Sequence, residues 1–303
     1  MSKSNLWCYF VAMIPPFMGA VSYVTSKYVI NEISPISLLF FRWIVAVIIL
    51  TPFLARNFYN DLAIIKSNIG VIFITAISGV TCFNLFLYHA LQFTSSTSAS
   101  IIVSLFPIFV LFLGVIVNKD SLHKTQISAI ILSFLGVLII VTHGNILSEI
   151  SSLFSNFGDF LALAAAACWA IYTFTVKFKP TDISFYSYIY STFLIGTILL
   201  LPLYLFDLFY LDNSFEPNLT IISVIFCLGF GVSIIGMLSF NSTILKIGPN
   251  LSSIFYYLAP LFTAILAIII LDEKIEYFHM VGMALILFGI NFPMVVKYFY
   301  QTS

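Results

Sequence analysis

Long apolar stretches, separated by short polar connections, run through almost the whole sequence and leave few possible folds. A helix needs about 20 apolar residues to cross a hydrocarbon core about 30 Å thick. Ten stretches approach this length, although some of them are short. They cover residues 6–30, 35–54, 68–91, 97–117, 126–142, 161–176, 184–206, 219–244, 251–271 and 278–296. We therefore expect an all-α integral membrane protein with ten transmembrane helices.

The composition fits a chain that lies mostly within a lipid bilayer. Of 303 residues, 61% are hydrophobic and 8% are charged, with 12 Lys+Arg balanced by 12 Asp+Glu. Soluble domains usually hold about 25% charged residues, so we exclude a soluble enzyme, a disordered protein and a nucleic-acid binder. The expected partners are the bilayer and a small-molecule substrate, and nothing in the sequence sets the oligomeric state. The cysteines lie in apolar stretches without CxxC spacing, so we expect neither a metal site nor a cofactor.

The basic residues indicate how the chain is oriented. If the N-terminus is cytoplasmic, nine basic residues near the ends of the stretches lie inside and two lie outside, which is the bias that cytoplasmic connections show. The nine are Lys3, Arg56, Lys66, Lys119, Lys124, Lys177, Lys179, Lys246 and Lys297, and the two are Lys27 and Lys274. We expect both termini in the cytoplasm.

The two halves of the chain resemble each other. A shift of 150 residues aligns the first part of each half, and a shift of 153 aligns the rest. The aligned pairs include Lys27 with Lys177, Pro52 with Pro202, Pro107 with Pro260 and Gly136 with Gly289. We expect five-helix repeats at residues 1–143 and 157–297, and an odd number of spans makes the second repeat inverted. Two inverted five-helix repeats are typical of secondary transporters, while the alternative is a duplicated membrane protein of another function.

Short motifs at matching places in the two halves carry a family resemblance. The first half holds Tyr88-His89-Ala90-Leu91, Ser98-Ala99-Ser100 and Leu105-Phe106-Pro107. The second half holds Leu245-Lys246-Ile247-Gly248-Pro249, Ser252-Ser253-Ile254, Leu258-Ala259-Pro260 and Leu271-Asp272-Glu273-Lys274. Over nearly the whole chain the sequence resembles the drug/metabolite transporter superfamily, specifically its EamA-type ten-span members.

The resemblance implies a central substrate cavity, lined mainly by spans 1, 3, 4, 6, 8 and 9 of the ten stretches. It also implies export or exchange of small metabolites, often amino acids, in a bacterial inner membrane. Two departures weaken any transfer of substrate identity. Asn118-Lys119-Asp120 replaces the usual acidic end in the first half, and residues 92–96 lack the Gly-Pro of the second half.

Arg42 is the clearest ionisable residue within an expected span. Such residues are functional candidates by default, so Arg42 could meet an anionic group of a substrate. We expect instead that it reaches the outer interface or binds helix-end carbonyls, because the second span should pack outside the central spans in this family. We expect no Asp or Glu at mid-depth, which makes a uniporter or exchanger at least as plausible as a proton antiporter.

The expected cavity is therefore polar but mostly uncharged, with aromatic walls and a few polar groups. Asn84 and Tyr88 are one turn apart on one helix face, as are Trp169 and Tyr172. The candidate substrate-binding residues are Tyr23, Asn84, Tyr88, Ser100, Ser104, Trp169, Tyr172, Asn241 and Tyr256. The alternative role of each aromatic residue is packing or the interfacial belt.

Prolines predict where helices bend. Pro107 and Pro260 match across the repeat and remove backbone hydrogen bonds inside their spans, so we expect symmetric hinges there. Pro15 and Pro16 interrupt the first span in the same way. Pro249 follows a glycine and is expected to begin a helix.

These features favour a secondary transporter that moves a small neutral or zwitterionic, amino-acid-like metabolite by alternating access, as an exporter or exchanger. The alternative is an integral membrane enzyme, such as a lipid-modifying transferase. That chemistry needs an activated nucleophile or a metal cluster, and the sequence has no HxxxH, HExxH or CxxC motif. We therefore expect no enzymatic activity.

Overall fold

The computed structural model describes residues 11–118 and 156–301, together with residues 128, 131–132, 135–136, 139, 142 and 144–145. The expected span at 126–142 lies mostly outside the described residues. Helices account for nearly all of the described chain, and no strand occurs within these ranges. The described helices are α2 (Ile14–Val29), α3 (Pro35–Asn60), α4 (Leu62–Ser67), α5 (Ile69–Thr75), η1 (Ala76–Cys82), α6 (Phe83–Phe93), α7 (Ser96–Val103), α8 (Phe106–Asn118), α11 (Phe157–Val176), α12 (Phe185–Tyr210), α13 (Leu219–Phe226), η3 (Cys227–Gly236), α14 (Met237–Ile247), α15 (Pro249–Phe255), α16 (Leu258–Leu271) and α17 (Tyr277–Gln301).

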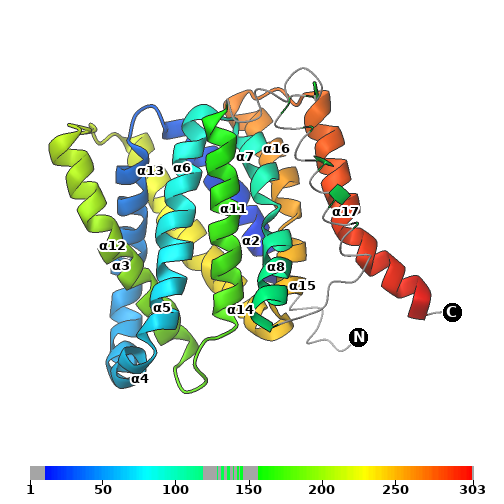
Figure 1. The fold of residues 1–303 in the computed structure, drawn as a ribbon. Coiled ribbons are helices and arrows are strands. Elements are labelled where there is room, and N and C mark those ends of the chain that lie inside the picture. Colours follow the sequence, from blue (N-terminus) through cyan, green and yellow to red (C-terminus); the bar gives the residue numbers. More distant parts are fainter. Residues whose placement is uncertain are drawn as a thin grey trace.

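The helices form an elongated bundle of roughly antiparallel rods (Figure 1). Within the described residues, six helices are long and apolar enough to cross a membrane: Pro35–Asn60, Ile69–Phe93, Ser96–Val117, Phe157–Val176, Phe185–Tyr210 and Leu219–Ile247. Leu258–Leu271 and Tyr277–Gly289 are shorter apolar helices. Large apolar side chains such as Phe53, Phe209 and Ile116 are more than 70% exposed on the outside of the bundle, as lipid contact requires. The chain is an integral membrane protein, and the count of ten spans stays a prediction.

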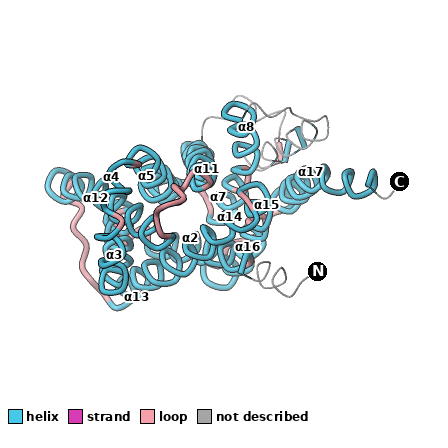
Figure 2. The backbone as a smooth tube through the Cα atoms, turned by 90° about the horizontal axis from the view of Figure 1, so that it is seen from below, coloured by secondary structure: helices cyan, strands magenta, loops and turns pink. Residues whose placement is uncertain are grey.

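Viewed along the bundle, α3, α12 and α13 lie at one end and α17 lies at the other (Figure 2). The middle holds α2, α7, α11, α14 and α16, which come from both halves of the chain (Figure 2). The second helix of each half, α3 or α12, thus lies to one side of this central group. The first helix of each half, α2 or α11, belongs to it.

The repeat-related helices α3 and α12 pack along each other in opposite directions. At one end, a carboxylate oxygen of Asp61, directly after α3, accepts a hydrogen bond from the Ser184 backbone N–H at 3.1 Å. At the other end, Asp207 near the end of α12 accepts hydrogen bonds from the hydroxyls of Ser34 and Ser37. Each helix therefore caps the start of its partner, which requires an antiparallel pair, as expected for inverted repeats.

The cap at Asp61 lies outside the membrane-spanning segments and holds a charged carboxylate. The Ser187 hydroxyl, and then the Ser184 backbone N–H, lower the pKa of Asp61 below its ordinary value of 3.8 by hydrogen bonding to the ionised form. Lys179 lies nearby and lowers the pKa further by a smaller amount. A negative charge at the N-terminus of α12 is also favoured by the helix dipole.

Two repeat-related helices contain a π-helical stretch in their middle. Residues Ala76–Cys82 form η1 and residues Cys227–Gly236 form η3. A π-helical turn widens the helix and leaves carbonyl groups that an α-helix would pair, and such turns often mark functional sites. Phe83 and Asn84, directly after η1, and Val232 and Gly236, within η3, line the central pocket described below. No sequence motif predicted these stretches.

The two helices that carry Pro107 and Pro260 are broken just before each proline. α7 ends at Val103 and α8 begins at Phe106, and α15 ends at Phe255 while α16 begins at Leu258. Each proline therefore lies in the first turn of a new helix, where its missing N–H costs little. The breaks are repeat-related, and whether they act as hinges stays a prediction. Pro249 begins α15, as the sequence predicts.

Candidate functional site

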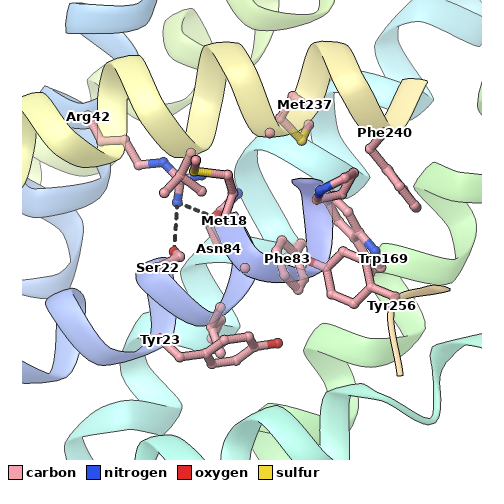
Figure 3. A pocket seen from close by; sticks show the side chains of 15 residues that line it. Met18, Ser22, Tyr23, Arg42, Phe83, Asn84, Trp169, Met237, Phe240 and Tyr256 are labelled. Carbon is pink, nitrogen blue, oxygen red and sulfur yellow. Dashed lines mark hydrogen bonds between the residues drawn. The ribbon is translucent and has the colours of Figure 1, made fainter. Parts of the chain in front are cut away.

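A cavity lies near the centre of the bundle, between residues of both repeats (Figure 3). Its empty space is about 430 Å³, which includes space open to solvent, but only about 30 Å³ of it admits the centre of a water molecule, which is room for about two waters. Its walls come from α2, α3 and α6 of the first repeat and from α11, η3 and α14 of the second. Tyr256, at the break between α15 and α16, completes the wall.

Arg42 of α3 is the only charged residue among those that line this cavity. Its side chain is 3% exposed and donates hydrogen bonds from Nε to Ser233 Oγ at 2.7 Å and from Nη1 to Asn84 Oδ1 at 2.9 Å. Nη1 also lies 2.5 Å from the Tyr88 hydroxyl and 3.4 Å from Ser22 Oγ. These acceptors come from α2, α6 and η3, so four elements meet at one guanidinium.

This geometry corrects the expectation that Arg42 reaches the outer interface or binds helix-end carbonyls. Helix α3 packs against α6 and η3, and the side chain of Arg42 points inward to acceptors on these elements and on α2. Among the described lining residues the cavity is mostly uncharged, as expected, but it carries the buried positive charge of Arg42, which was expected elsewhere. The guanidinium also lies over the rings of Trp43 and Tyr88, at 5.2 and 5.9 Å from the centroids.

Asn84 links Arg42 to the π-helical stretch of its own helix. Its side-chain amide donates to the carbonyls of Gly79 and Val80 at 2.9 and 3.0 Å. Its oxygen is thereby aimed at Arg42. The amide thus satisfies carbonyls released by η1 and holds the guanidinium in place, which an aliphatic residue could not do.

The opposite part of the cavity is aromatic. Trp169 of α11 stacks on Tyr172 and on Phe240 of α14, with centroid distances of 4.9 and 5.2 Å. Phe83 lies 4.5 Å from it and Tyr256 lies 6.0 Å from it. Figure 3 shows Arg42 and Ser22 toward one end and the rings of Trp169, Phe240 and Tyr256 toward the other. The cavity is therefore amphipathic.

The predicted site residues divide into three groups. Tyr23, Asn84, Trp169 and Tyr256 line the cavity. Tyr88 lies behind it and binds Arg42, while Tyr172 and Asn241 form a hydrogen-bonded pair that supports Trp169. Ser100 and Ser104 do not line it, since their hydroxyls donate to the carbonyls of Thr97 and Ile101 in their own helix.

Several residues of the site were not among the predicted ones. Arg42, Ser22, Phe83 and Phe240 line the cavity, and Ser233 binds Arg42 from behind. Its position inside an apolar stretch marked Arg42 as a functional candidate, but we expected it at the interface because the second span was expected outside the central spans. Phe240 carries no such signal, because the chain has 33 phenylalanines.

Two buried polar atoms at the cavity lack a hydrogen-bond partner among the described residues. They are the Tyr23 hydroxyl and Trp169 Nε1. Buried polar groups are normally paired, because an unpaired one loses its bonds to water without replacement. Both atoms belong to residues that line the cavity, although neither atom is itself exposed to solvent.

One end of the bundle is closed by contacts around the connection between α6 and α7. Lys27 Nζ donates to the carbonyls of Leu91 and Thr94 at 2.5 and 3.0 Å. Glu273, after α16, accepts from the backbone N–H groups of Ser96 and Thr97 at 2.9 and 3.3 Å and from both hydroxyls at 2.7 Å. Glu273 thus caps α7 from the second repeat.

The repeat-related lysine at the opposite end makes different contacts. Lys177 is exposed, and within the described ranges it makes no hydrogen bond to the end of α14. Its contact there is with the ring of its neighbour Phe178, at 5.9 Å. The two ends of the bundle therefore differ, although the lysines match in sequence.

A second and larger hollow lies at the helix ends, beside the connection between α2 and α3. Its empty space is about 790 Å³, and it is lined by loop residues with His89 and Asp207. Asp207 there caps α3 as described above. We take the central cavity as the candidate site because it lies between the helices of both repeats and carries the buried Arg42, whereas the second hollow lies among helix ends and connections.

Comparisons with known proteins agree with these observations. A family model described as the EamA-like transporter family matches residues 6–142 and again residues 156–293. An uncharacterized transporter of Archaeoglobus fulgidus is 28% identical over 279 residues, which cover 89% of this chain and 91% of the relative. The uncharacterized transporter YyaM of Bacillus subtilis is 27% identical over 274 residues, covering 90% and 88%. A solved protein structure covers 98% of this chain and 99% of its own with a TM-score of 0.63, and its 16% identity makes it a likeness of fold alone.

Proposed function

The chain belongs to the EamA-like transporter family, and on this premise we propose that it is a secondary transporter for a small, amino-acid-like metabolite, neutral or zwitterionic. The observation that carries the proposal is the central cavity, which both repeats build and which is polar on one side and aromatic on the other. Sites for small molecules usually combine apolar and aromatic walls with a few placed polar groups. The candidate substrate-binding residues that line it are Tyr23, Asn84, Trp169 and Tyr256.

Alternating access is the proposed mechanism. Lys27 and Glu273 make contacts at the α6–α7 connection, at one end of the bundle, and we propose that these contacts close the cavity on that side. A shift of 153 places Ile244 and Ile247 where Leu91 and Thr94 lie. We propose that the other state releases Lys27 and lets Lys177 bind the carbonyls of Ile244 and Ile247. Inverted repeats make two such states close in energy.

The direction of transport is proposed as export or exchange. No Asp or Glu is among the lining residues, and proton relays within membranes usually use such groups. This favours uniport or exchange over proton antiport. The bias of lysines and arginines supports both termini in the cytoplasm, and the family and the short connections support a location in the plasma (inner) membrane.

Flux measurements in proteoliposomes test the proposal. Purified protein is reconstituted and loaded with radiolabelled L-amino acids, nucleosides or amphipathic cations, and efflux and counterflow are followed. We expect saturable flux of at least one amino acid, and a smaller flux after Asn84→Ala and after Trp169→Ala at unchanged reconstitution. If no solute of the panel moves faster than in protein-free liposomes, the proposed function is wrong.

A further inference from the structure

We infer that Arg42 binds a carboxylate of the transported solute, so that the substrates are small carboxylates with an apolar body. This inference rests on the proposed function and narrows it. Neutral solutes, which the proposed class still includes, are then poor substrates. Amphipathic cations are excluded.

The first observation is that the charge of Arg42 has no partner of opposite sign at the cavity. The residue is 3% exposed, and its hydrogen-bond acceptors in the described residues are two serines, an asparagine and a tyrosine. All four are neutral. An arginine stays charged when buried, and a buried charge is costly unless an opposite charge compensates it. An anionic ligand would supply that charge.

The second observation concerns which nitrogens of the Arg42 guanidinium donate hydrogen bonds to the protein. Nε donates to Ser233, and Nη1 donates to Asn84 and Tyr88. Among the described residues, Nη2 donates no hydrogen bond to the protein. A guanidinium has five donors in a planar fork that matches a carboxylate. Ser233, Asn84 and Tyr88 therefore fix the plane of the fork and leave one of its nitrogens for a ligand.

The third observation concerns the rest of the solute. The wall across from Arg42 consists of Trp169, Phe240 and Tyr256, whose rings stack or meet edge to face. Figure 3 shows these rings across from Arg42, so an apolar body would lie against them while its carboxylate meets Arg42, once the cavity opens beyond the small volume it has here. The unpaired Trp169 Nε1 and Tyr23 hydroxyl are further donors for a polar substituent.

A purely structural arginine predicts a different outcome. In that case Arg42 joins α2, α3, α6 and η3, and its loss lowers stability without changing which solutes bind. The structural role and the binding role of Arg42 therefore differ in whether removing the carboxylate of the solute weakens binding. The decisive comparison therefore changes the solute before it changes the protein.

The test uses wild-type protein and matched pairs of solutes. Phenylacetate is compared with phenylacetamide, and each common L-amino acid with its carboxamide, by ligand-induced thermal shift and by inhibition of flux in proteoliposomes. We expect each carboxylate that binds to bind about tenfold or more tightly than its carboxamide, as for a charge-assisted pair. Equal affinity within the pairs would overturn the inference.

Variants then assign the preference to Arg42. Arg42→Gln should remove the difference between carboxylate and carboxamide, and Arg42→Lys should keep part of it, since lysine retains the charge without the fork. Arg56→Gln is the matched control, because Arg56 is exposed at the far end of α3 and does not line the cavity. A carboxylate preference that survives in Arg42→Gln would also overturn the inference.

The failures of the inference and of the proposed function are distinguishable. Absence of flux for every solute rejects the transporter. Flux that does not distinguish carboxylates from carboxamides leaves the transporter in place and rejects the role of Arg42. If Arg42→Gln does not fold, the solute pairs on wild-type protein still decide.

Discussion

The two repeats use the same kinds of contact where α3 and α12 hold together, and they differ where they line the cavity. In the α3–α12 pair, Ser34 and Ser184 begin the two helices, each accepting from the backbone N–H three residues later at 3.1 Å. An aspartate from the partner helix reaches each of these starts. The pair is thus nearly symmetric in chemistry as well as in shape.

In the cavity, by contrast, positions related by the same shifts carry residues of different chemistry. Arg42 corresponds to Thr192, and Gly19 corresponds to Trp169. Gly19 leaves no room for a larger residue, because a Cβ there would lie 2.7 Å from the Tyr256 hydroxyl. The first repeat therefore supplies the positive charge of Arg42 and the space beside Gly19, and the second repeat supplies the ring of Trp169.

This difference has a physical reason. A symmetric frame lets the two states of an alternating-access transporter have similar energy, because the same contacts form in either orientation. A solute with a charged end and an apolar end has no such symmetry. Its site must be asymmetric even when the frame is not.

The largest effect is expected from a fixed negative charge beside Arg42. Ser22 lines the cavity with its hydroxyl 3.4 Å from Nη1, so Ser22→Asp would place a carboxylate where the solute is inferred to place its own. We expect carboxylate flux to fall by about a hundredfold, because the internal carboxylate occupies the guanidinium.

Ser22→Asn is the matched control, since it has the same shape without the charge. It should retain most of the flux. Equal flux through Ser22→Asp and Ser22→Asn would show that the charged side of the cavity does not bind the solute. The difference between the charged wall and the aromatic wall would then have no role in binding the solute.

The aromatic wall is tested next by Trp169→Ala and Trp169→Phe. Trp169 stacks on Tyr172 and Phe240, so its removal opens the wall against which the apolar body is proposed to lie. We expect flux at low solute concentration to fall about tenfold in Trp169→Ala, and much less in Trp169→Phe, which keeps a ring. An unchanged flux in Trp169→Ala, with the protein monodisperse, would place the solute elsewhere.

The symmetric features are those that the sequence could predict, because they follow local rules. A serine before a proline-started helix predicts the cap at Ser34, and a proline after glycine predicts the start of α15. Pro107 and Pro260 predicted the places where two helices break. Each of these depends on residues within one or two turns.

The asymmetric features depended on how helices are rotated against each other. Within a membrane, the lipid-facing and core-facing sides of α3 are both apolar, so its pattern cannot tell which side carries Arg42 inward. The π-helical stretches near Asn84 and Val232 are repeat-related, but they too have no side-chain signature from which they could be predicted. Trp169 and Tyr256 were predictable as aromatic residues of central spans, but the ring of Phe240 between them was not.

A smaller effect separates the two ends of the bundle. Lys27→Ala removes the donor that holds the carbonyls of Leu91 and Thr94. We expect amide hydrogen exchange across residues 91–97 to rise severalfold, because the closed state loses these contacts.

Lys177→Ala is the repeat-related counterpart and should not raise amide hydrogen exchange at residues 91–97. If Lys177 makes its contacts only in the other state, its loss favours the present one, and exchange at 91–97 falls or stays unchanged. A rise of equal size in both variants would mean that the lysines act as general anchors. The proposed exchange of contacts between the two ends would then be wrong.

The smallest effect is expected in the symmetric frame, at Asp61. Asp61→Asn weakens the cap on α12 and should lower the melting temperature by about 1 to 3 °C at neutral pH without changing the flux per folded molecule. Because hydrogen bonds from Ser187 and Ser184 lower the pKa of Asp61 in the folded protein, its contribution is present above its ordinary value of 3.8 and is lost as the pH falls through the lowered value. The melting temperatures of wild type and Asp61→Asn, compared by thermal unfolding from pH 7 downward, should therefore converge in acid.

A difference in melting temperature that persists in strong acid would show that Asp61 acts through shape and not through charge. A large loss of flux at neutral pH would show that the frame and the cavity are not separable.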